Sequence, residues 1–312
     1  MSERLVVALG GNALLRRGEA PGAEQQRRNI ERAADMLAEL WRDNDLTVTH
    51  GNGPQVGLLA LQAEALKDVS PYPLDVLGAE SEGMIGYMIE QALLSRMPGR
   101  HVATLLTQVE VDARDPAFAN PTKPIGPVYD EATAQRLARE RGWRIVPDGG
   151  GFRRVVASPM PLAIVELPTI KLLVQSGVLV ICAGGGGIPV VRDASGALHG
   201  VPAVVDKDRA SAVLARALDA DALLMLTDVP AVYADWESER PRAIRRIGVP
   251  ALRAMRFAAG TMEPKVEAAC RFVEASGRWA AIGALQDGVA IAAGDAGTRV
   301  VADDEAASYW EG

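Results

Sequence analysis

The chain has 312 residues, a formal net charge of −7, and 48% hydrophobic residues. This length suits one large α/β domain or two modest ones, and the apolar content is sufficient for a large core. The acidic balance argues against a nucleic-acid or membrane-surface partner, because no basic excess exists to neutralise phosphates. It still allows a local basic pocket that binds a small phosphate.

Two cysteines, Cys182 and Cys270, lie far apart and lack metal-ligand spacing, which is typical of reduced thiols in a cytosolic protein. The histidines are scattered, so we expect no metal bound directly by the protein. The three histidines are His50, His101 and His199. The apolar run Leu5–Leu9 is too short for a signal peptide or a membrane span, and we expect a cytoplasmic protein.

Short apolar and β-branched runs predict five buried strands along the chain. These strands are Leu5–Leu9, Leu46–His50, His101–Val109, Val178–Ala183 and Ala222–Thr227. Between them, apolar residues at helical spacing predict helices. The helices are Glu24–Asn44, Leu74–Met97, Asp208–Leu218, Pro250–Phe257 and Pro264–Ser276. This alternation predicts an α/β fold with a mostly parallel sheet covered on both sides.

Residues 112–161 break the alternation. They are rich in proline, glycine and charge, as in Asn120–Pro127, and they hold one polar helix, Glu131–Arg141, and a second loop, Asp148–Arg154. A loop this long inside a compact domain is usually a lid or a small inserted subdomain. We therefore expect one domain, residues 1–312, that carries a protruding subdomain at 112–161.

Glycine-rich turns follow three of the predicted strands. The turns are Gly10-Gly11-Asn12, Gly51-Asn52-Gly53 and Gly184-Gly185-Gly186-Gly187. In open parallel sheets, ligands bind beyond the carboxyl ends of the strands, and glycine lets backbone N–H groups approach an anion. A single turn of this kind is more simply explained as a tight connection. Three at strand ends favour an oxyanion or phosphate site made of main chain.

The standard nucleotide motifs are absent. The sequence contains neither G-x-x-x-x-G-K-[ST] nor G-x-G-x-x-G, which argues against a P-loop NTPase and a classical NAD enzyme. It also lacks a nucleophile elbow and a protein-kinase signature. Any phosphate chemistry must therefore use another arrangement of groups.

Only five of the 33 basic residues are lysine. Lys123 lies in the proline-rich loop, Lys207 stands between Asp206 and Asp208, and Lys265 begins a predicted helix. Lysine offers a compact charge that suits a transferring phosphoryl group. The two remaining lysines, Lys67 and Lys171, fall in ordinary helical stretches and are expected at the surface. Phosphoryl transfer needs mainly in-line positioning and charge neutralisation, which lysines and backbone donors supply.

Eight segments, in order along the chain, resemble carbamate kinases of the amino acid kinase superfamily. They are 9–13 (LGGNA), 49–57 (THGNGPQVG), 120–127 (NPTKPIGP), 148–159 (DGGGFRRVVASP), 184–190 (GGGGIPV), 205–211 (VDKDRAS), 227–233 (TDVPAVY) and 260–269 (GTMEPKVEAA). The last two would fit several members of the superfamily. The loops at 120–127 and 148–159 point to the carbamate branch.

The resemblance implies a three-layer α/β/α sandwich with a mainly parallel eight-stranded central sheet and a small protruding subdomain. It implies a homodimer that uses ATP, with Mg²⁺ carried by the nucleotide. The implied reaction is carbamoyl phosphate + ADP = carbamate + ATP, within arginine breakdown.

The resemblance also implies roles for individual residues. Lys123 would reach the transferring group from the subdomain, Lys207 and Lys265 would stabilise the bridging charge, and Asp208 would orient the lysines. The residues implied to hold carbamate and the phosphoryl group are Gly10, Gly11, Asn12, Gly51, Asn52, Gly53, Gly185 and Gly186. The residues implied to border the nucleotide are Thr227, Asp228, Tyr233, Met262 and Pro264.

Two departures and three alternatives remain. Ala8 stands where much of the superfamily has a lysine, which counts against acetylglutamate, aspartate or uridylate kinases. Pro230-Ala231 replaces a commoner glycine, and we expect only a local adjustment there. The alternatives are a paralogue acting on another small acid or phosphonate, a catalytically silent binding protein on the same fold, and an NAD-dependent dehydrogenase.

Overall fold

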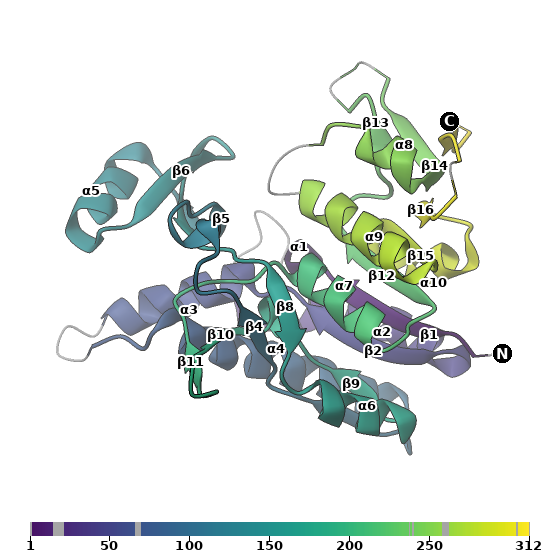
Figure 1. The fold of residues 1–312 in the computed structure, drawn as a ribbon, viewed down its shortest axis with the longest axis horizontal. Coiled ribbons are helices and arrows are strands. Elements are labelled where there is room, and N and C mark those ends of the chain that lie inside the picture. Colours follow the sequence, from purple (N-terminus) through teal and green to yellow (C-terminus); the bar gives the residue numbers. More distant parts are fainter. Residues whose placement is uncertain are drawn as a thin grey trace.

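The computed structural model describes residues 2–14, 22–65, 70–236, 238, 240–257, 262–303 and 305–311. Within these ranges a large sheet lies between two layers of helices (Figure 1). None of the helices in the described ranges is long and apolar enough to cross a membrane. The α/β fold expected from the alternating pattern is thus confirmed.

The central sheet has ten strands, eight of which contain three or more residues. In spatial order these eight are β14 (Arg242–Gly248), β16 (Thr298–Val301), β15 (Trp279–Ala284), β12 (Ala222–Thr227), β1 (Arg4–Leu9), β2 (Asp45–His50), β9 (Leu179–Ile181) and β3 (Val102–Thr104). Neighbours are parallel except β15 and β16. The two-residue strands β13 (Tyr233–Ala234) and β17 (Ser308–Tyr309) pair antiparallel with β14. The sheet is therefore mainly parallel, as expected.

Helices cover both faces of this sheet because its strands alternate apolar side chains between two cores. Leu5, Val7 and Leu9 belong to one core, and Val6 and Ala8 to the other. The helices packed on the first core are α1 (Gly11–Leu14), α2 (Ala23–Asp43), α4 (Leu74–Arg96) and α10 (Gly288–Ala293), preceded by the short turn η3 (Leu285–Asp287). Those on the second are α6 (Leu167–Gln175), α7 (Lys207–Ala217), α8 (Val249–Arg253) and α9 (Glu263–Ser276).

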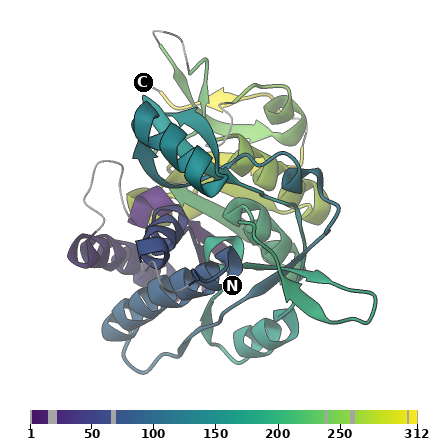
Figure 2. The same ribbon diagram turned by 90° about the vertical axis from the view of Figure 1, so that its left-hand side faces the viewer.

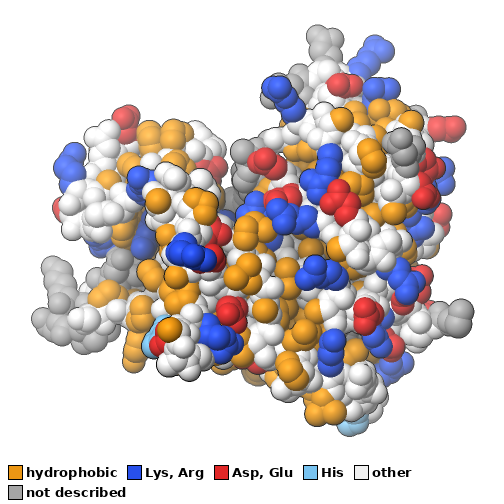
Figure 3. Space-filling view, in the orientation of Figure 1, with side chains coloured by type: hydrophobic (Ala, Val, Ile, Leu, Met, Phe, Trp, Pro, Cys, Tyr) orange, Lys and Arg blue, Asp and Glu red, His pale blue; other side chains and the backbone are white. Residues whose placement is uncertain are grey.

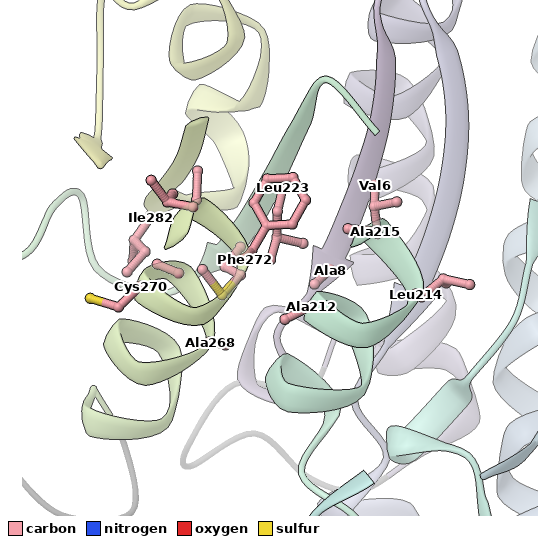
Figure 4. Packing of buried hydrophobic residues seen from close by; sticks show 14 of the residues in the cluster. Val6, Ala8, Ala212, Leu214, Ala215, Leu223, Ala268, Cys270, Phe272 and Ile282 are labelled. Carbon is pink, nitrogen blue, oxygen red and sulfur yellow. The ribbon is translucent and has the colours of Figure 1, made fainter. Parts of the chain in front are cut away.

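Small side chains bring α7 and α9 close to the second face of the sheet (Figure 4). Ala212 and Ala215 of α7 lie near Val6 and Ala8 of β1, and Phe272 of α9 lies beside Leu223 of β12. All of these side chains are buried. This packing fixes where the first turns of both helices lie at the carboxyl edge of the sheet.

The segment His101–Val109 is not one strand, so that prediction is wrong. β3 ends at Thr104, and β4 (Gln108–Val111) belongs to a second sheet. The partners of β4 in that sheet are β8 (Pro161–Ile164), β10 (Ile188–Arg192) and β11 (Leu198–Gly200). The chain turns at Thr107, whose hydroxyl donates to the Leu105 carbonyl (2.9 Å), a side-chain bond that a hydrophobic run does not reveal.

The helix predicted at Pro250–Phe257 is shorter than expected. α8 ends at Arg253, and the amide of Met255 donates to the Leu252 carbonyl three residues back (3.2 Å). The last turn is therefore tightened and the helix stops. The other four predicted helices agree with the structure to within one residue at each end.

Residues 112–161 leave the second sheet after Val111 and return at Pro161, where β4 and β8 pair. Between these points lie η1 (Pro116–Phe118), β5 (Lys123–Tyr129), α5 (Glu131–Arg141), β6 (Arg144–Asp148) and β7 (Gly151–Val156). The three strands form their own antiparallel sheet, which stands apart from the central sheet (Figures 1 and 2). We call residues 112–161 the protruding subdomain. That it acts as a lid stays a prediction.

The protruding subdomain rests on α3 (Gly53–Ala65) through two glycines. A Cβ added to Gly57 would lie 2.0 Å from the Cα of Gly126, which itself has φ +73°. Val56 of α3 and Ile125 of β5 are buried beside this contact. The two backbones touch directly, so the position of β5 depends on the absence of side chains there.

Replacing Gly57 should therefore disturb the subdomain. We expect Gly57→Ala to lower the free energy of unfolding by about 1–3 kcal/mol, as overpacking does, measured by urea denaturation. Gly78→Ala is the matched control, because no atom lies within 4 Å of a Cβ at this position in α4. The control should be neutral or stabilising by up to about 1 kcal/mol. Equal stability of the two variants would contradict a tight Gly57–Gly126 contact.

Candidate active site

The first turn of α7 carries the central charges. Asp206 caps the helix, because its Oδ1 accepts hydrogen bonds from the backbone N–H of Asp208 (3.0 Å) and of Arg209 (3.4 Å). Asp206, Lys207 and Asp208 are all buried. The helix thus begins with three charged side chains inside the protein, which requires that each be paired.

Lys207 and Lys265 share the carboxylate of Asp208. The Nζ of Lys207 donates to Oδ1 (2.5 Å), and the Nζ of Lys265, from the first turn of α9, donates to Oδ2 (2.8 Å). Burial opposes the ionised form of Asp208, but the two ammonium groups outweigh it and hold the pKa of the carboxyl well below its usual range.

The two lysines differ in their electrostatics. Burial lowers the pKa of Lys207, and Lys265 adds to this effect although Asp208 opposes it. Burial also opposes the charge of Lys265, but Asp208, with help from Asp206 and Asp228, holds its pKa above the ordinary value. The site therefore keeps a fixed positive charge at Lys265.

Lys123 reaches the same place from the protruding subdomain. Its Nζ donates to Asp206 Oδ2 (2.5 Å), on the side of the carboxyl that does not cap α7. Burial and the neighbouring Asp208 oppose the charge of Asp206, but Lys123 and Lys207 together outweigh them and lower the pKa of that carboxyl. The space-filling view shows a notch between the subdomain and the body of the protein (Figure 3). Lys123 crosses between these two parts.

The first two glycine turns lie against each other and against Lys207. The N–H of Gly10 donates to the Leu226 carbonyl (2.7 Å), and that of Gly51 to the Leu9 carbonyl (2.9 Å). A Cβ added to Gly51 would lie 2.7 Å from the backbone N of Gly11 and 3.4 Å from Cδ of Lys207. No side chain fits between these turns.

The third turn, η2 (Gly184–Gly186), closes the site from another strand. A Cβ on Gly185 would lie 2.1 Å from Nδ2 of Asn52, and one on Gly186 would lie 2.2 Å from the Val205 carbonyl oxygen. By contrast, nothing lies within 4 Å of a Cβ at Gly53. The structure thus brings together Gly10, Gly11, Gly51, Asn52, Gly185 and Gly186. The side chain of Asn12 falls outside the described part.

Some of the residues expected to border the nucleotide lie beside the glycine turns. Thr227 ends β12 next to Gly10, and its hydroxyl donates to Asp228 (3.1 Å), whose charge also acts on Lys265. Met262 occupies the N-cap position of α9, and Pro264 stands in the first turn of that helix. Tyr233 lies further out, on β13, where its ring meets Trp236 edge-on at 5.4 Å.

Sequence reasoning missed the polar groups beneath the turns. Glu82 of α4 and His50 of β2 are fully buried, and Asp206 links Lys123 to α7. Burial raises the pKa of Glu82 to about 8 and lowers that of His50 to about 4. The acids flanking Lys207 were a visible signal for Asp206. No pattern marks Glu82, because an acid on a helix is ordinarily exposed.

Within the described ranges, no three or more His, Cys, Asp and Glu side chains are grouped so that they could hold a metal ion. What the site offers is three ammonium groups, two paired carboxylates and three closely packed glycine turns at the carboxyl edge of a parallel sheet. This arrangement defines a class of site: one that binds and neutralises a small oxyanion or phosphoryl group.

Comparisons with known proteins agree with this class. Residues 3–283 match the amino acid kinase family. A carbamate kinase of Haemophilus influenzae is 54% identical over 308 residues, covering 98% of this chain and 99% of the relative, and one of Rhizobium meliloti is 53% identical over 300 residues, covering 95% and 93%. The chain therefore belongs to the amino acid kinase family. These relatives confirm the resemblance to its carbamate branch.

Solved structures agree as well. Carbamate kinase from Giardia lamblia bound to AMP-PNP matches with a TM-score of 0.88 at 41% identity, covering 97% of this chain and 99% of the other. The same enzyme bound to citric acid matches with a TM-score of 0.91. The large, mostly parallel sheet between helical layers is thus the architecture of these enzymes.

Removing the shared carboxylate should leave two buried ammonium groups unpaired. We expect Asp208→Asn to lower the free energy of unfolding by about 3–5 kcal/mol in urea at pH 7. The pKa of Asp208 is lowered on folding, so its contribution is present above the unfolded value of about 3.9 and is lost as the pH falls below it.

The control for this variant is Asp235→Asn, at an exposed pair with Arg242 in which both side chains are more than half exposed. That change should cost at most about 1 kcal/mol. A loss for Asp208→Asn no larger than the control's would mean that the carboxylate does not hold the lysines together.

Proposed function

We propose that this chain catalyses the reversible transfer of a phosphoryl group between ATP and carbamate, as a carbamate kinase working in arginine breakdown. The observation that carries the proposal is the pair Lys207–Lys265, held on one buried carboxylate beside glycine turns. Carbamate kinases that are 53–54% identical over almost the whole chain support the same substrate.

A site lined by main chain suits carbamate. Carbamate has no side chain to recognise, so its binding must rely on backbone donors and a few amides. The turns at 8–11 and 49–57 carry no acidic side chain that could bind an α-amino group. Asn52 already occupies the space beside Gly185, which leaves little room for a larger acceptor.

In the direction of ATP synthesis, an oxygen of the ADP β-phosphate forms a bond to the phosphorus of carbamoyl phosphate. The bond from that phosphorus to the carbamate oxygen breaks, and its electron pair leaves with carbamate. Lys207 and Lys265 each donate one N–H to Asp208 and keep two for phosphoryl oxygens. Charge on the equatorial and bridging oxygens is thereby neutralised without proton transfer.

The nucleotide would lie beside Thr227, Asp228, Tyr233, Met262 and Pro264, next to Lys265. Mg²⁺ would enter on the phosphates of the nucleotide, where it screens their charge. The AMP-PNP complex of the Giardia enzyme supports a nucleotide site in this chain. Both cysteines are buried and unpaired, in keeping with the cytoplasmic location that we propose.

The direct test is ATP formation by the purified protein from ADP, Mg²⁺ and carbamoyl phosphate, with acetyl phosphate in a parallel reaction. Fast ATP formation from carbamoyl phosphate alone would establish the substrate. ADP binding without ATP formation would keep the nucleotide site but reject carbamate in favour of another small acid.

Lys123 is proposed to contact the transferring group from the protruding subdomain. Lys123→Ala should lower kcat by about 100-fold or more, the scale seen when one oxyanion donor is lost, while the Kd for ADP stays within about twofold. The control is Lys171→Ala, an exposed lysine of α6, which should match the wild type in both measurements. Equal losses of turnover and ADP binding for Lys123→Ala would assign the residue to folding or to the nucleotide instead.

We also propose that two copies of the chain associate through α4. Its exposed side carries Met84, Tyr87 and Leu94, at helical spacing, with Leu106 beside them. Tyr87→Glu should shift the molar mass in solution from dimer to monomer, measured by light scattering. A wild type that is monomeric at micromolar concentration would reject the proposal.

A further inference from the structure

One turn of α4 contacts two parts of the proposed acceptor site, Asn52 and the Gly184–Gly187 turn. Ser81 and Glu82 are almost completely buried there. The Oγ of Ser81 accepts a hydrogen bond from Nδ2 of Asn52 (2.7 Å). The Oε1 of Glu82 accepts one from the backbone N–H of Gly184 (2.7 Å), and its Oε2 accepts one from that of Thr107 (3.2 Å).

The turn that Glu82 holds has an unusual backbone. Ala183 has φ +49°, a conformation costly for any residue with a Cβ, and Gly185 and Gly186 follow with φ of +69° and +97°. Such a turn persists only where its surroundings fix it. The N–H of Ala183 is held by the Thr107 hydroxyl (2.9 Å), and the next N–H, that of Gly184, is held by Glu82.

Neighbouring side chains pack closely against the turn. Atoms of His50 and Glu82 lie 2.4 Å and 2.8 Å from where a Cβ on Gly184 would be. The Nδ2 of Asn52, which donates to Ser81, lies 2.1 Å from where a Cβ on Gly185 would be. The distance between Asn52 and the Gly184–Gly187 turn is thus set by Ser81 and Glu82, which are neighbours on α4.

The charge of Glu82 suits this position. Burial raises its pKa to about 8, and hydrogen bonds from Thr107 and Gly184 only partly oppose this. At pH 7 the carboxyl is therefore mostly neutral and places no negative charge beside an anion. A protonated carboxyl still has acceptor capacity on its oxygens for the two N–H donors.

We propose that Glu82 is a positioning residue of the acceptor site: by holding Thr107 and Gly184 it fixes the Gly184–Gly187 turn, and so sets the affinity for carbamoyl phosphate and carbamate. This inference rests on the proposed function. It assigns no contact between Glu82 and the substrate.

The test is Glu82→Gln, which keeps size and neutrality but turns an NH₂ group toward one of the two N–H donors. One buried hydrogen bond is then lost. The KM for carbamoyl phosphate should rise about tenfold or more at pH 7, while the KM for ADP changes less than about twofold. The matched control is Glu80→Gln on the exposed side of the same helix, which should change neither KM.

The pH profile separates positioning from a merely structural role. In the wild type, the KM for carbamoyl phosphate should rise from pH 7 to pH 9 as Glu82 ionises beside an anion. In Glu82→Gln it should be higher but flat over this range. The titratable groups facing Glu82 are His50, with a pKa of about 4, Cys182, whose pKa burial raises far above the usual range, and Glu166.

A measurement on the free protein keeps this inference separate from the proposed function. Amide hydrogen exchange of residues 183–187 should be faster in Glu82→Gln than in the wild type. If Glu82→Gln does not fold, Ser81→Ala is the second variant, and it should raise the same KM by releasing Asn52. Unchanged exchange, or equal rises in both KM values, would overturn the proposal. A wild type that makes no ATP from carbamoyl phosphate would reject only the function.

Discussion

Two ammonium groups are held within the protein by one carboxylate, and the position of the site depends on this triad. Asp208 and Lys207 begin α7, whereas Lys265 begins α9, and 57 positions of sequence separate Asp208 from Lys265. Only the packing of both helices on the same face of the sheet brings their first turns together. Packing of the apolar core thus positions the charged side chains. Small residues such as Ala212 let α7 lie close enough to β1 for the triad to form.

Around the triad, the three lysines that we propose to contact the substrate come from two parts of the fold. The body supplies Lys207 and Lys265, and the protruding subdomain supplies Lys123 through its bond to Asp206. Asp206 therefore has two roles, since one carboxyl oxygen caps α7 and the other accepts a hydrogen bond from Lys123. A shift of the subdomain on its glycine contact with α3 would change the charge at the site without altering the sheet.

Much of this was predictable from sequence, for physical reasons. β1 and β12 are almost continuous apolar runs, as expected for a strand buried on both faces, and the three glycine turns follow β1, β2 and β9. The neighbouring strands β14, β16 and β15 were not predicted, because Arg242–Gly248 carries three arginines and Trp279–Ala284 consists mostly of alanine and glycine, which are not typical of strands. Glu82 could not be found, because Glu80 and Glu82 look alike in sequence and only the packed structure buries one of them. The break at Thr107 depends on a single hydroxyl.

A site formed mainly by glycine turns has a consequence for how the specificity of such a protein can change. Every amino acid except proline carries the same amide N–H, so a point mutation in the turns at Gly51 or Gly185 removes space and not hydrogen-bond donors. Random single substitutions there would mostly abolish binding and rarely redirect it. New acceptor preferences would instead require altered loop lengths or altered supports beneath the loops. Laboratory evolution for a different small acid would therefore do better with insertions and deletions than with saturation mutagenesis of the pocket.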